Sequence, residues 1–196
     1  LYYISVKYES EHNNINTSTR QFCFHDLKCI TKKEKSGGRS LYFENNGRKI
    51  FAKGANWIPV DALPSRWDVE TYYDLLKSAY DANMNCIRVW GGGIYEKDCF
   101  YQICDRLGLI VWQDFMFACS LYPASEEFLS QVRKEVTYQV NRLQSHACIG
   151  IWCGNNENFG TLTWFPESRQ NRDRYLVDYD RLYQGTIRPI VQKLDP

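Results

Sequence analysis

The sequence lacks both a long apolar run and an excess of charge of either sign. No apolar stretch approaches the roughly 20 residues that a membrane-spanning helix needs, and none resembles a secretory signal peptide. The 24 Lys and Arg residues are balanced by 23 Asp and Glu residues, which leaves a net charge of +1. This balance gives no electrostatic footprint for nucleic acid or for an acidic membrane surface. We therefore expect no nucleic-acid partner, no membrane partner and a neutral ligand.

The sequence also lacks the Cys-x-x-Cys pairs that are typical of zinc sites. Its eight cysteines lie mostly inside apolar runs of a chain too long to be a small disulfide scaffold, so we expect free thiols. Two groupings invite a metal interpretation: Cys99 with Cys104, and His146 with Cys148 and Cys153. Neither has the paired spacing, and alternate residues of a strand point to opposite faces, so we expect no metal site.

The first 50 residues predict β structure. Residues 1–10 and 20–30 have the pattern of two strands, and the polar loop between them holds a potential N-glycosylation site at Asn16. Because a two-stranded hairpin is marginally stable alone, these strands are expected to form the edge of a larger domain. A second hairpin is predicted around residues 45–48, whose Asn and Gly tolerate positive φ.

From Gly54 onward the pattern alternates between short apolar strands and amphipathic helices. Asp68 and Ser125 are expected to cap the starts of two helices, and Gly108 is expected to end another. The other predicted elements are strands before Gly54 and at residues 86–90, 109–112 and 148–152, and a last helix over residues 175–193. Short apolar strands separated by helices indicate an α/β fold with a parallel sheet and right-handed crossovers.

Four such βα units fit two architectures. A complete (β/α)8 TIM barrel typically needs ~250 residues, so this chain would hold its first half. A small doubly wound sheet is the competing architecture, and composition does not separate the two.

Polar and Trp side chains gather where the predicted strands end, which is where α/β proteins bind ligands. Glu157 stands beside an amide directly after a strand and is a candidate proton donor. Arg88 would be costly to bury unpaired, so it needs a carboxylate partner, either a catalytic nucleophile or Asp114. The 14 Tyr and 6 Trp residues have rings that can cover the apolar faces of sugars, although core packing explains them equally. These features suggest a carbohydrate site.

The glycines at residues 91–93 offer a second interpretation, because backbone N–H groups at a helix start can bind phosphate. No Gly-Lys-Ser, Gly-Lys-Thr or G-x-G-x-x-G sequence accompanies them, and glycines also permit tight turns and close packing. His146 lies at a helix-to-strand connection, at the opposite end from the strand ends that carry Glu157, and is expected to act as a cap.

Four long segments carry a resemblance to a known family. They are FAKGANWIP (residues 51–59), DANMNCIRVWGGGIYE (81–96), VWQDFMFA (111–118) and WCGNNEN (152–158). In this order they resemble β-mannosidases of glycoside hydrolase family 2, and the resemblance covers about residue 40 to the end. It implies three parts: residues 1–30 are the last strands of an immunoglobulin-like β-sandwich, 31–40 are a linker, and 41–196 are the N-terminal half of a TIM barrel.

The resemblance implies a retaining exo-glycosidase that hydrolyses terminal non-reducing β-D-mannose residues from oligosaccharides and glycoconjugates. It makes Glu157 the general acid/base and gives Asn156 a hydrogen bond to the sugar 2-hydroxyl. It places five further residues around the mannose: Arg88, Trp90, Asn56, Trp57 and Asp114. No metal or organic cofactor is implied. The implied location is lysosomal or secreted, and a cytoplasmic location stays open.

Two parts of the family's machinery do not occur in this sequence: the nucleophile, a second Glu on a later barrel strand, and the N-terminal sugar-binding-like domain. Retaining hydrolysis needs two carboxyl groups about 5–5.5 Å apart. We therefore expect the chain to come from a longer protein, to depend on the remaining half-barrel and N-terminal domains, and to be inactive alone. Two alternatives stay open: a non-catalytic carbohydrate-binding fragment and a phosphate-binding α/β domain.

Overall fold

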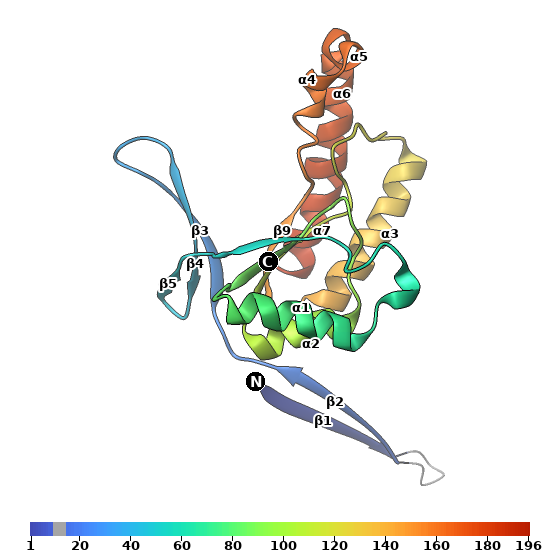
Figure 1. Cartoon of the computed structure of the whole chain (residues 1–196). Coiled ribbons are helices and arrows are strands. Elements are labelled where there is room, and N and C mark those ends of the chain that lie inside the picture. The colour runs from blue at the N-terminus through green and yellow to red at the C-terminus, as the bar shows by residue number, and fades with distance from the viewer. Residues whose placement is uncertain (10–14) are drawn as a thin grey trace.

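The computed structural model describes residues 1–9 and 15–196, which form three sheets and a set of helices (Figure 1). The strands are β1 (Tyr2–Glu9), β2 (Ile15–Phe22), β3 (Leu27–Lys33), β4 (Arg39–Asn45), β5 (Arg48–Ile50), β6 (Gly54–Trp57), β7 (Cys86–Val89), β8 (Ile110–Asp114) and β9 (Ile149–Cys153). The helices are α1 (Val69–Asp81), α2 (Asp98–Leu107), α3 (Glu126–Leu143), α4 (Thr161–Trp164), α5 (Pro166–Gln170), α6 (Arg172–Tyr179) and α7 (Arg188–Leu194), with a 3-10 turn at Pro64–Arg66 and a π-helical stretch at Asp180–Ile187.

β1 and β2 form an antiparallel hairpin that projects from the body of the molecule (Figure 1). The prediction of one strand over residues 20–30 is wrong in extent, because β2 ends at Phe22 and irregular backbone separates it from β3. The potential glycosylation site at Asn16 consequently lies on an exposed strand rather than in a loop. The first part of the predicted loop, residues 10–14, lies outside the described residues.

β3, β4 and β5 form a three-stranded antiparallel sheet. β3 and β4 pair as far as Lys33 opposite Arg39, so residues 31–40, expected to be a linker, form instead the strand ends and the turn of a hairpin. Their charged composition reflects the exposure of this turn. The second turn agrees with the prediction, because Asn46 and Gly47 have φ values of 50° and 77°, as a two-residue hairpin turn requires.

β6, β7, β8 and β9 form a parallel sheet in which each strand pairs with the next one along the chain. The first of these strands is Gly54–Trp57 itself, not the segment before it, because Gly54 pairs with Cys86 and Trp57 with Val89. An order that follows the chain without reversal is that of a barrel, whereas a doubly wound sheet contains a reversal point. The described strands thus have a singly wound α/β order.

The helix ends follow the predicted caps. Asp68 accepts a hydrogen bond from the Thr71 backbone N–H at 2.8 Å at the start of α1. Ser125 accepts one from the Phe128 backbone N–H at 3.3 Å at the start of α3. Gly108, with φ of 71°, ends α2. These local signals place the helices between the parallel strands.

One face of the parallel sheet is covered by helices. Ile87 and Val89 are 2% and 1% exposed and pack with buried residues of α1 and α2. Arg88 stands between them and points to the other face, because successive strand residues alternate. The buried cluster on that other face contains strand residues only. A doubly wound sheet carries helices on both faces, so the described residues favour the barrel architecture.

The three-stranded sheet covers one end of the open face. Phe43 of β4, which is 2% exposed, packs with Cys86 and Ile110. These are the first residues of β7 and β8, so the contact lies at the N-terminal ends of the parallel strands. The C-terminal ends of the strands are left free on this face.

The C-terminal segment is helical, and α4, α5 and α6 project from the body as an arm (Figure 1). α6, the π-helical stretch and α7 follow one another directly where one helix is predicted over residues 175–193. Pro189 lacks a backbone N–H and crowds the carbonyl four residues before it, which explains the widened hydrogen bonding just ahead of it. α4 and α5 were not predicted. Among the described residues, no helix combines the length and apolarity needed to cross a membrane.

Candidate functional site

The register of the parallel sheet brings polar side chains together on its open face. Asn56, Arg88 and Trp112 occupy neighbouring positions on β6, β7 and β8. Asn156 follows β9 and is bridged to Ala118, beyond the end of β8. The four strands therefore contribute to one site near their C-terminal ends, where α/β proteins bind ligands.

Arg88 is at the centre of this site. Its Nη2 donates to Asp114 Oδ2 and to Asn156 Oδ1, both at 2.7 Å, and its Nε donates to Asp114 Oδ1 at 3.3 Å. Its Nη1 donates to Asn56 Oδ1 at 3.2 Å. Because a guanidinium group can only donate, these bonds also fix which way both amides point. We call this set of four residues the Arg88 network.

Asp114 is the predicted carboxylate partner of Arg88, and the ion pair is confirmed. Its side chain is fully buried, whereas that of Arg88 is 24% exposed. The Gly91 backbone N–H and Trp112 Nε1 also donate to Asp114, each at 3.0 Å. A buried carboxylate is tolerated when it is paired and hydrogen-bonded in this way. With these donors around it, Asp114 holds the Arg88 guanidinium in place, and its own place in the mannose subsite stays a prediction.

Glu157 lies in a turn that is tied to the segment after β8. The Asn156 backbone N–H donates to the Phe117 carbonyl, and the Cys119 backbone N–H donates to the Asn156 carbonyl, both at 2.9 Å. Glu157 and Cys119 have φ values of 61° and 51°, in a region that costs non-glycine residues about 1–3 kcal/mol each and is concentrated at functional sites. Glu157 is exposed, so its carboxyl group is accessible to a ligand.

The C-terminal helical segment, from α6 through the π-helical stretch, supports this turn. Asn158 Nδ2 donates to the Tyr183 hydroxyl at 2.6 Å, and Asn155 Nδ2 donates to the Tyr179 hydroxyl at 3.4 Å. Tyr183 belongs to the π-helical stretch and Tyr179 directly precedes it. Both neighbours of the Asn156–Glu157 pair are therefore anchored to the C-terminal helical segment, which holds the pair at the strand ends.

Trp57 does not lie in the site, which corrects its assignment to the mannose subsite. Its side chain is 9% exposed and belongs to the hydrophobic core beneath the helices. Its Nε1 donates to Glu96 Oε1 at 3.0 Å. Asn56 and Trp57 are adjacent on β6, so their side chains point to opposite faces of the sheet.

Glu96 is a buried carboxyl group outside the site. It is 2% exposed and also accepts a hydrogen bond from the Tyr72 hydroxyl at 2.5 Å. Burial raises the pKa of Glu96, and the hydrogen bonds from Tyr72 and Trp57 partly oppose that shift. Its position in the core of the helix-covered face gives it a structural role.

The glycines after β7 serve close packing, which contradicts the phosphate interpretation. The Gly91 backbone N–H is bonded to Asp114, and a Cβ at Gly92 would lie 2.0 Å from the Trp90 ring. α2 begins only at Asp98, so the glycines do not stand at a helix start. The Trp90 ring lies against Gly92 of its own loop, and its place in the mannose subsite stays a prediction.

Sequence reasoning misses two residues of this site, Trp112 and Cys119. Trp112 donates to Asp114 and places its ring 5.7 Å from the Arg88 guanidinium carbon. Its spacing of two residues from Asp114 on one strand was a usable signal. Cys119 accepts a hydrogen bond from Asn156 Nδ2 at 3.2 Å. Its place depends on pairing between distant segments, so no local pattern reveals it.

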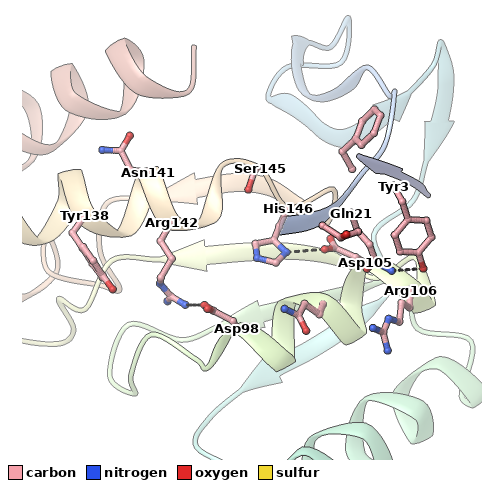
Figure 2. A pocket seen from close by; sticks show the side chains of 13 residues that line it. Tyr3, Gln21, Asp98, Asp105, Arg106, Tyr138, Asn141, Arg142, Ser145 and His146 are labelled. Atoms are coloured by element: carbon pink, nitrogen blue, oxygen red, sulfur yellow. Dashed lines mark hydrogen bonds and ion pairs between the residues drawn. The ribbon is translucent and has the colours of Figure 1, made fainter. Parts of the chain in front are cut away.

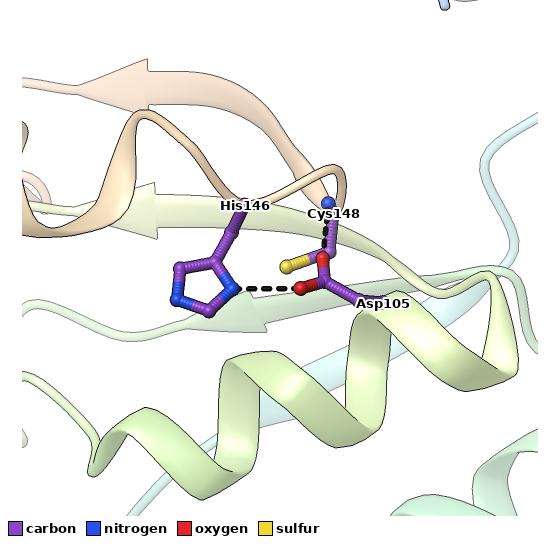
Figure 3. A group of neighbouring side chains, drawn as sticks. All are labelled: Asp105, His146 and Cys148. Carbon is purple, nitrogen blue, oxygen red and sulfur yellow. Dashed lines mark hydrogen bonds and ion pairs between the residues drawn. The ribbon is translucent and has the colours of Figure 1, made fainter. Parts of the chain in front are cut away.

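A second polar cluster lies at the N-terminal end of β9 (Figure 3). Asp105 Oδ1 accepts from the Cys148 backbone N–H at 2.8 Å, and Asp105 Oδ2 lies 2.7 Å from His146 Nδ1. The potential ligand atoms of these three residues lie within 4.8 Å of one another. However, both carboxylate oxygens are engaged, and burial raises the pKa of the Cys148 thiol well above its usual range, which opposes the thiolate that zinc requires. The cluster therefore ties α2 to β9; the His146 ring contacts Asp105 of α2, and Gln144 rather than His146 stands at the end of α3.

A cleft of about 800 Å³ separates the β1–β2 hairpin from α2 and α3 (Figure 2). Tyr3 lines it from the hairpin and His146 from the body. Because His146 precedes the N-terminal end of β9, this cleft lies at the opposite end of the sheet from Glu157. The open face carries its own pocket of about 290 Å³, lined in part by Asn56 and Arg88. Asn56 and Arg88 connect this smaller pocket to the Arg88 network, whereas its other lining residues lie near the starts of β6 and β7.

Known proteins similar to this chain include several β-mannosidases, although no protein-family model matches it. The β-mannosidase of Rattus norvegicus is 55% identical over 162 residues, which are 82% of this chain and 18% of the rat protein. β-Mannosidase of Capra hircus is 51% identical over 83% of this chain and 19% of the goat protein. β-Mannosidase B of Emericella nidulans is 42% identical over 100% of this chain and 24% of the fungal protein. The chain thus spans about a fifth of the length of these relatives.

Solved structures agree with these relatives. The β-D-mannosidase from Dictyoglomus thermophilum superposes with a TM-score of 0.81 and 39% identity, over 91% of this chain and 21% of that one. β-Glucuronidase 3 from Bacteroides uniformis has a TM-score of 0.76 over 99% of this chain and 22% of that one, and its 19% identity shows a shared fold alone. The predicted resemblance is confirmed: over most of its length this chain is homologous to β-mannosidases.

Proposed function

We propose that this homologue of β-mannosidases supplies the acid/base side of the active site of a retaining exo-β-mannosidase of glycoside hydrolase family 2. In this proposal β6–β9 are the first half of a TIM barrel, and β1 and β2 belong to an immunoglobulin-like sandwich. The observation that carries the proposal is the Arg88 network, which holds Asn156, and with it Glu157, at the free ends of the parallel strands. The strand order and the single helix-covered face support it.

Each residue of the site has a role in the proposed reaction. Glu157 protonates the glycosidic oxygen as the leaving group departs, then accepts a proton from the attacking water. Arg88 donates a hydrogen bond to the side-chain oxygen of Asn156, so the NH₂ group of Asn156 points away from Arg88. One of its N–H groups can then donate to the mannose 2-hydroxyl. Arg88 and Asn56 line the sugar subsite, and Asp114 holds Arg88 in place.

The nucleophile must come from outside this chain. Asp114 is the carboxylate of the Arg88 network, but it is fully buried and accepts from Arg88, Gly91 and Trp112. It cannot reach a sugar carbon without breaking these bonds. A retaining mechanism needs a second carboxyl group about 5–5.5 Å from Glu157. We expect the 196-residue chain alone to show no turnover of a chromogenic β-mannoside.

Glu157→Gln in the full-length protein tests the proposal, because it removes proton transfer while keeping the shape of the side chain. Substrates with poor leaving groups should lose roughly 10²–10⁴-fold in kcat, the usual contribution of general acid catalysis. Aryl mannosides with activated leaving groups should keep a fast first step and accumulate the covalent intermediate, and azide should restore turnover. Glu127→Gln, an exposed position on α3, is the matched control. Equal loss for both substrate classes without azide rescue would remove Glu157 from the acid/base role.

A non-catalytic carbohydrate-binding role is the second candidate, supported by the same sugar-facing groups without a nucleophile. Mannose binding by a full-length protein that lacks hydrolytic activity would favour it. The exposed potential glycosylation site at Asn16 supports a lysosomal or secreted location within the main proposal. Mass spectrometry of the full-length protein from its native host would detect the attached glycan.

A further inference from the structure

A free thiol lies between the two residues assigned to the reaction. Cys119 Sγ accepts a hydrogen bond from Asn156 Nδ2 at 3.2 Å and lies 3.7 Å from Glu157 Oε2, to which it donates. The direction of both bonds is determined by chemistry. Arg88 can only donate, so Asn156 must turn its oxygen toward Arg88 and its NH₂ group toward sulfur. The S–H proton is then left to point at the carboxyl group.

The backbone around the thiol is held on several sides. The Cys119 N–H donates to the Asn156 carbonyl at 2.9 Å, and the N–H of the preceding residue, Ala118, donates to the Tyr122 hydroxyl at 3.1 Å. Cys119 and Glu157 are two of the four non-glycine residues with positive φ in the described chain. Two such conformations facing each other across a hydrogen-bonded bridge indicate that the surrounding structure enforces them.

We propose that Cys119 is a positioning residue that couples Asn156 to Glu157. A continuous series of donors runs from Arg88 through Asn156 and Cys119 to the Glu157 carboxyl group. The thiol restrains the carboxyl group through its hydrogen bond to Oε2 and so holds Glu157 in one orientation beside Asn156. The inference rests on the proposed function, because it assigns Cys119 a role in the reaction of that same site.

Cys119→Ala and Cys119→Ser in the full-length protein separate this role from simple packing. Ala removes both hydrogen bonds, and Ser keeps a group that accepts from Asn156 and donates to Glu157. Since a hydrogen bond of this kind contributes about 0.5–1.5 kcal/mol, Ala should lower kcat on poor leaving groups by about three- to tenfold. KM and the first step with activated aryl mannosides should change little, and Ser should recover most of the lost kcat. Cys99→Ser, a partly buried thiol on α2, is the control.

Alkylation gives an independent measurement, because Cys119 is an exposed free thiol. Iodoacetamide forms a bond between sulfur and its methylene carbon, iodide leaves, and the thiol proton goes to solvent. The added amide group should block the space beside Glu157 and inactivate the wild type, with protection by saturating mannose. The Cys119→Ser protein should resist, and the Cys99→Ser protein should be inactivated like the wild type.

The outcomes distinguish this inference from the proposed function. If Glu157→Gln loses activity as expected but Cys119→Ala keeps full kcat on poor leaving groups, the positioning role is wrong and the proposed function stands. Equal loss in Ala and Ser, or inactivation of the Cys119→Ser protein by iodoacetamide, would also overturn the positioning role. If Glu157→Gln keeps its activity, the proposed function itself fails.

Discussion

Replacing Asp114 with Asn tests whether the Arg88 network holds the site together. The change is nearly isosteric, but it removes the only charge paired with Arg88 in the network and turns one acceptor oxygen into a donor facing other donors. Removing one partner of a buried pair costs about 3–5 kcal/mol. The Arg88 side chain is 24% exposed, so water can partly compensate, and we expect the lower end, about 3 kcal/mol.

The assay is urea unfolding of the full-length protein, followed by Trp fluorescence, together with kcat/KM on an aryl mannoside. Arg88 orients Asn156, so activity should fall at urea concentrations where the protein is still folded. Asp98→Asn is the matched control, because Asp98 pairs with Arg142 but its side chain is 63% exposed, and surface pairs contribute about 0–1 kcal/mol. A loss of stability in Asp114→Asn no larger than in this control would refute the reasoning.

Two further predictions concern the core and the glycine loop. Gly92→Ala should displace the Trp90 ring, which a Cβ would approach to 2.0 Å. The free energy of unfolding, measured by thermal denaturation, should fall by about 1–3 kcal/mol. Gly185→Ala is the control and should lower it much less, because the atom nearest to its Cβ lies at 3.7 Å. Burial raises the pKa of Glu96, so this carboxyl group holds its proton more tightly in the folded state than in the unfolded state. The stability of the wild type therefore falls as pH rises from the ordinary carboxyl pKa through the raised pKa of Glu96. Glu96→Gln should therefore gain stability relative to the wild type as pH rises above the ordinary carboxyl pKa; parallel pH profiles would contradict this.

The three helices between the parallel strands, α1, α2 and α3, and most of the strands were predictable because their signals are local. Asp68, Ser125 and Gly108 each act within one helical turn of their own position, and all three cap as expected. The linker prediction failed because strand pairing is not local. The charged residues 31–40 look like a linker until β4 returns alongside β3.

For the residues of the site, too, local signals were predictive and contacts between distant segments were not. Asp114 was one of two carboxylate partners expected for Arg88, and the pair forms because Arg88 lies opposite Trp112, two residues before Asp114 on the same face. Alternation along a strand shows that Asn56 and Trp57, which are adjacent, cannot both face a ligand, and the structure places Trp57 in the core. Cys119 reaches the site only through the bridge between residues 118 and 156, which no spacing within either segment predicts.

The packing of the β3–β5 sheet against the starts of β7 and β8 has a kinetic consequence. This contact covers the starts of β7 and β8, so in the proposed enzyme the substrate enters and both products leave at the C-terminal ends of the strands. In the proposed enzyme the leaving group lies nearer that entrance and departs first, while the mannose below it stays until water has released it. Free mannose should then compete with the substrate for the emptied pocket, and its escape, rather than bond cleavage, can set the turnover rate.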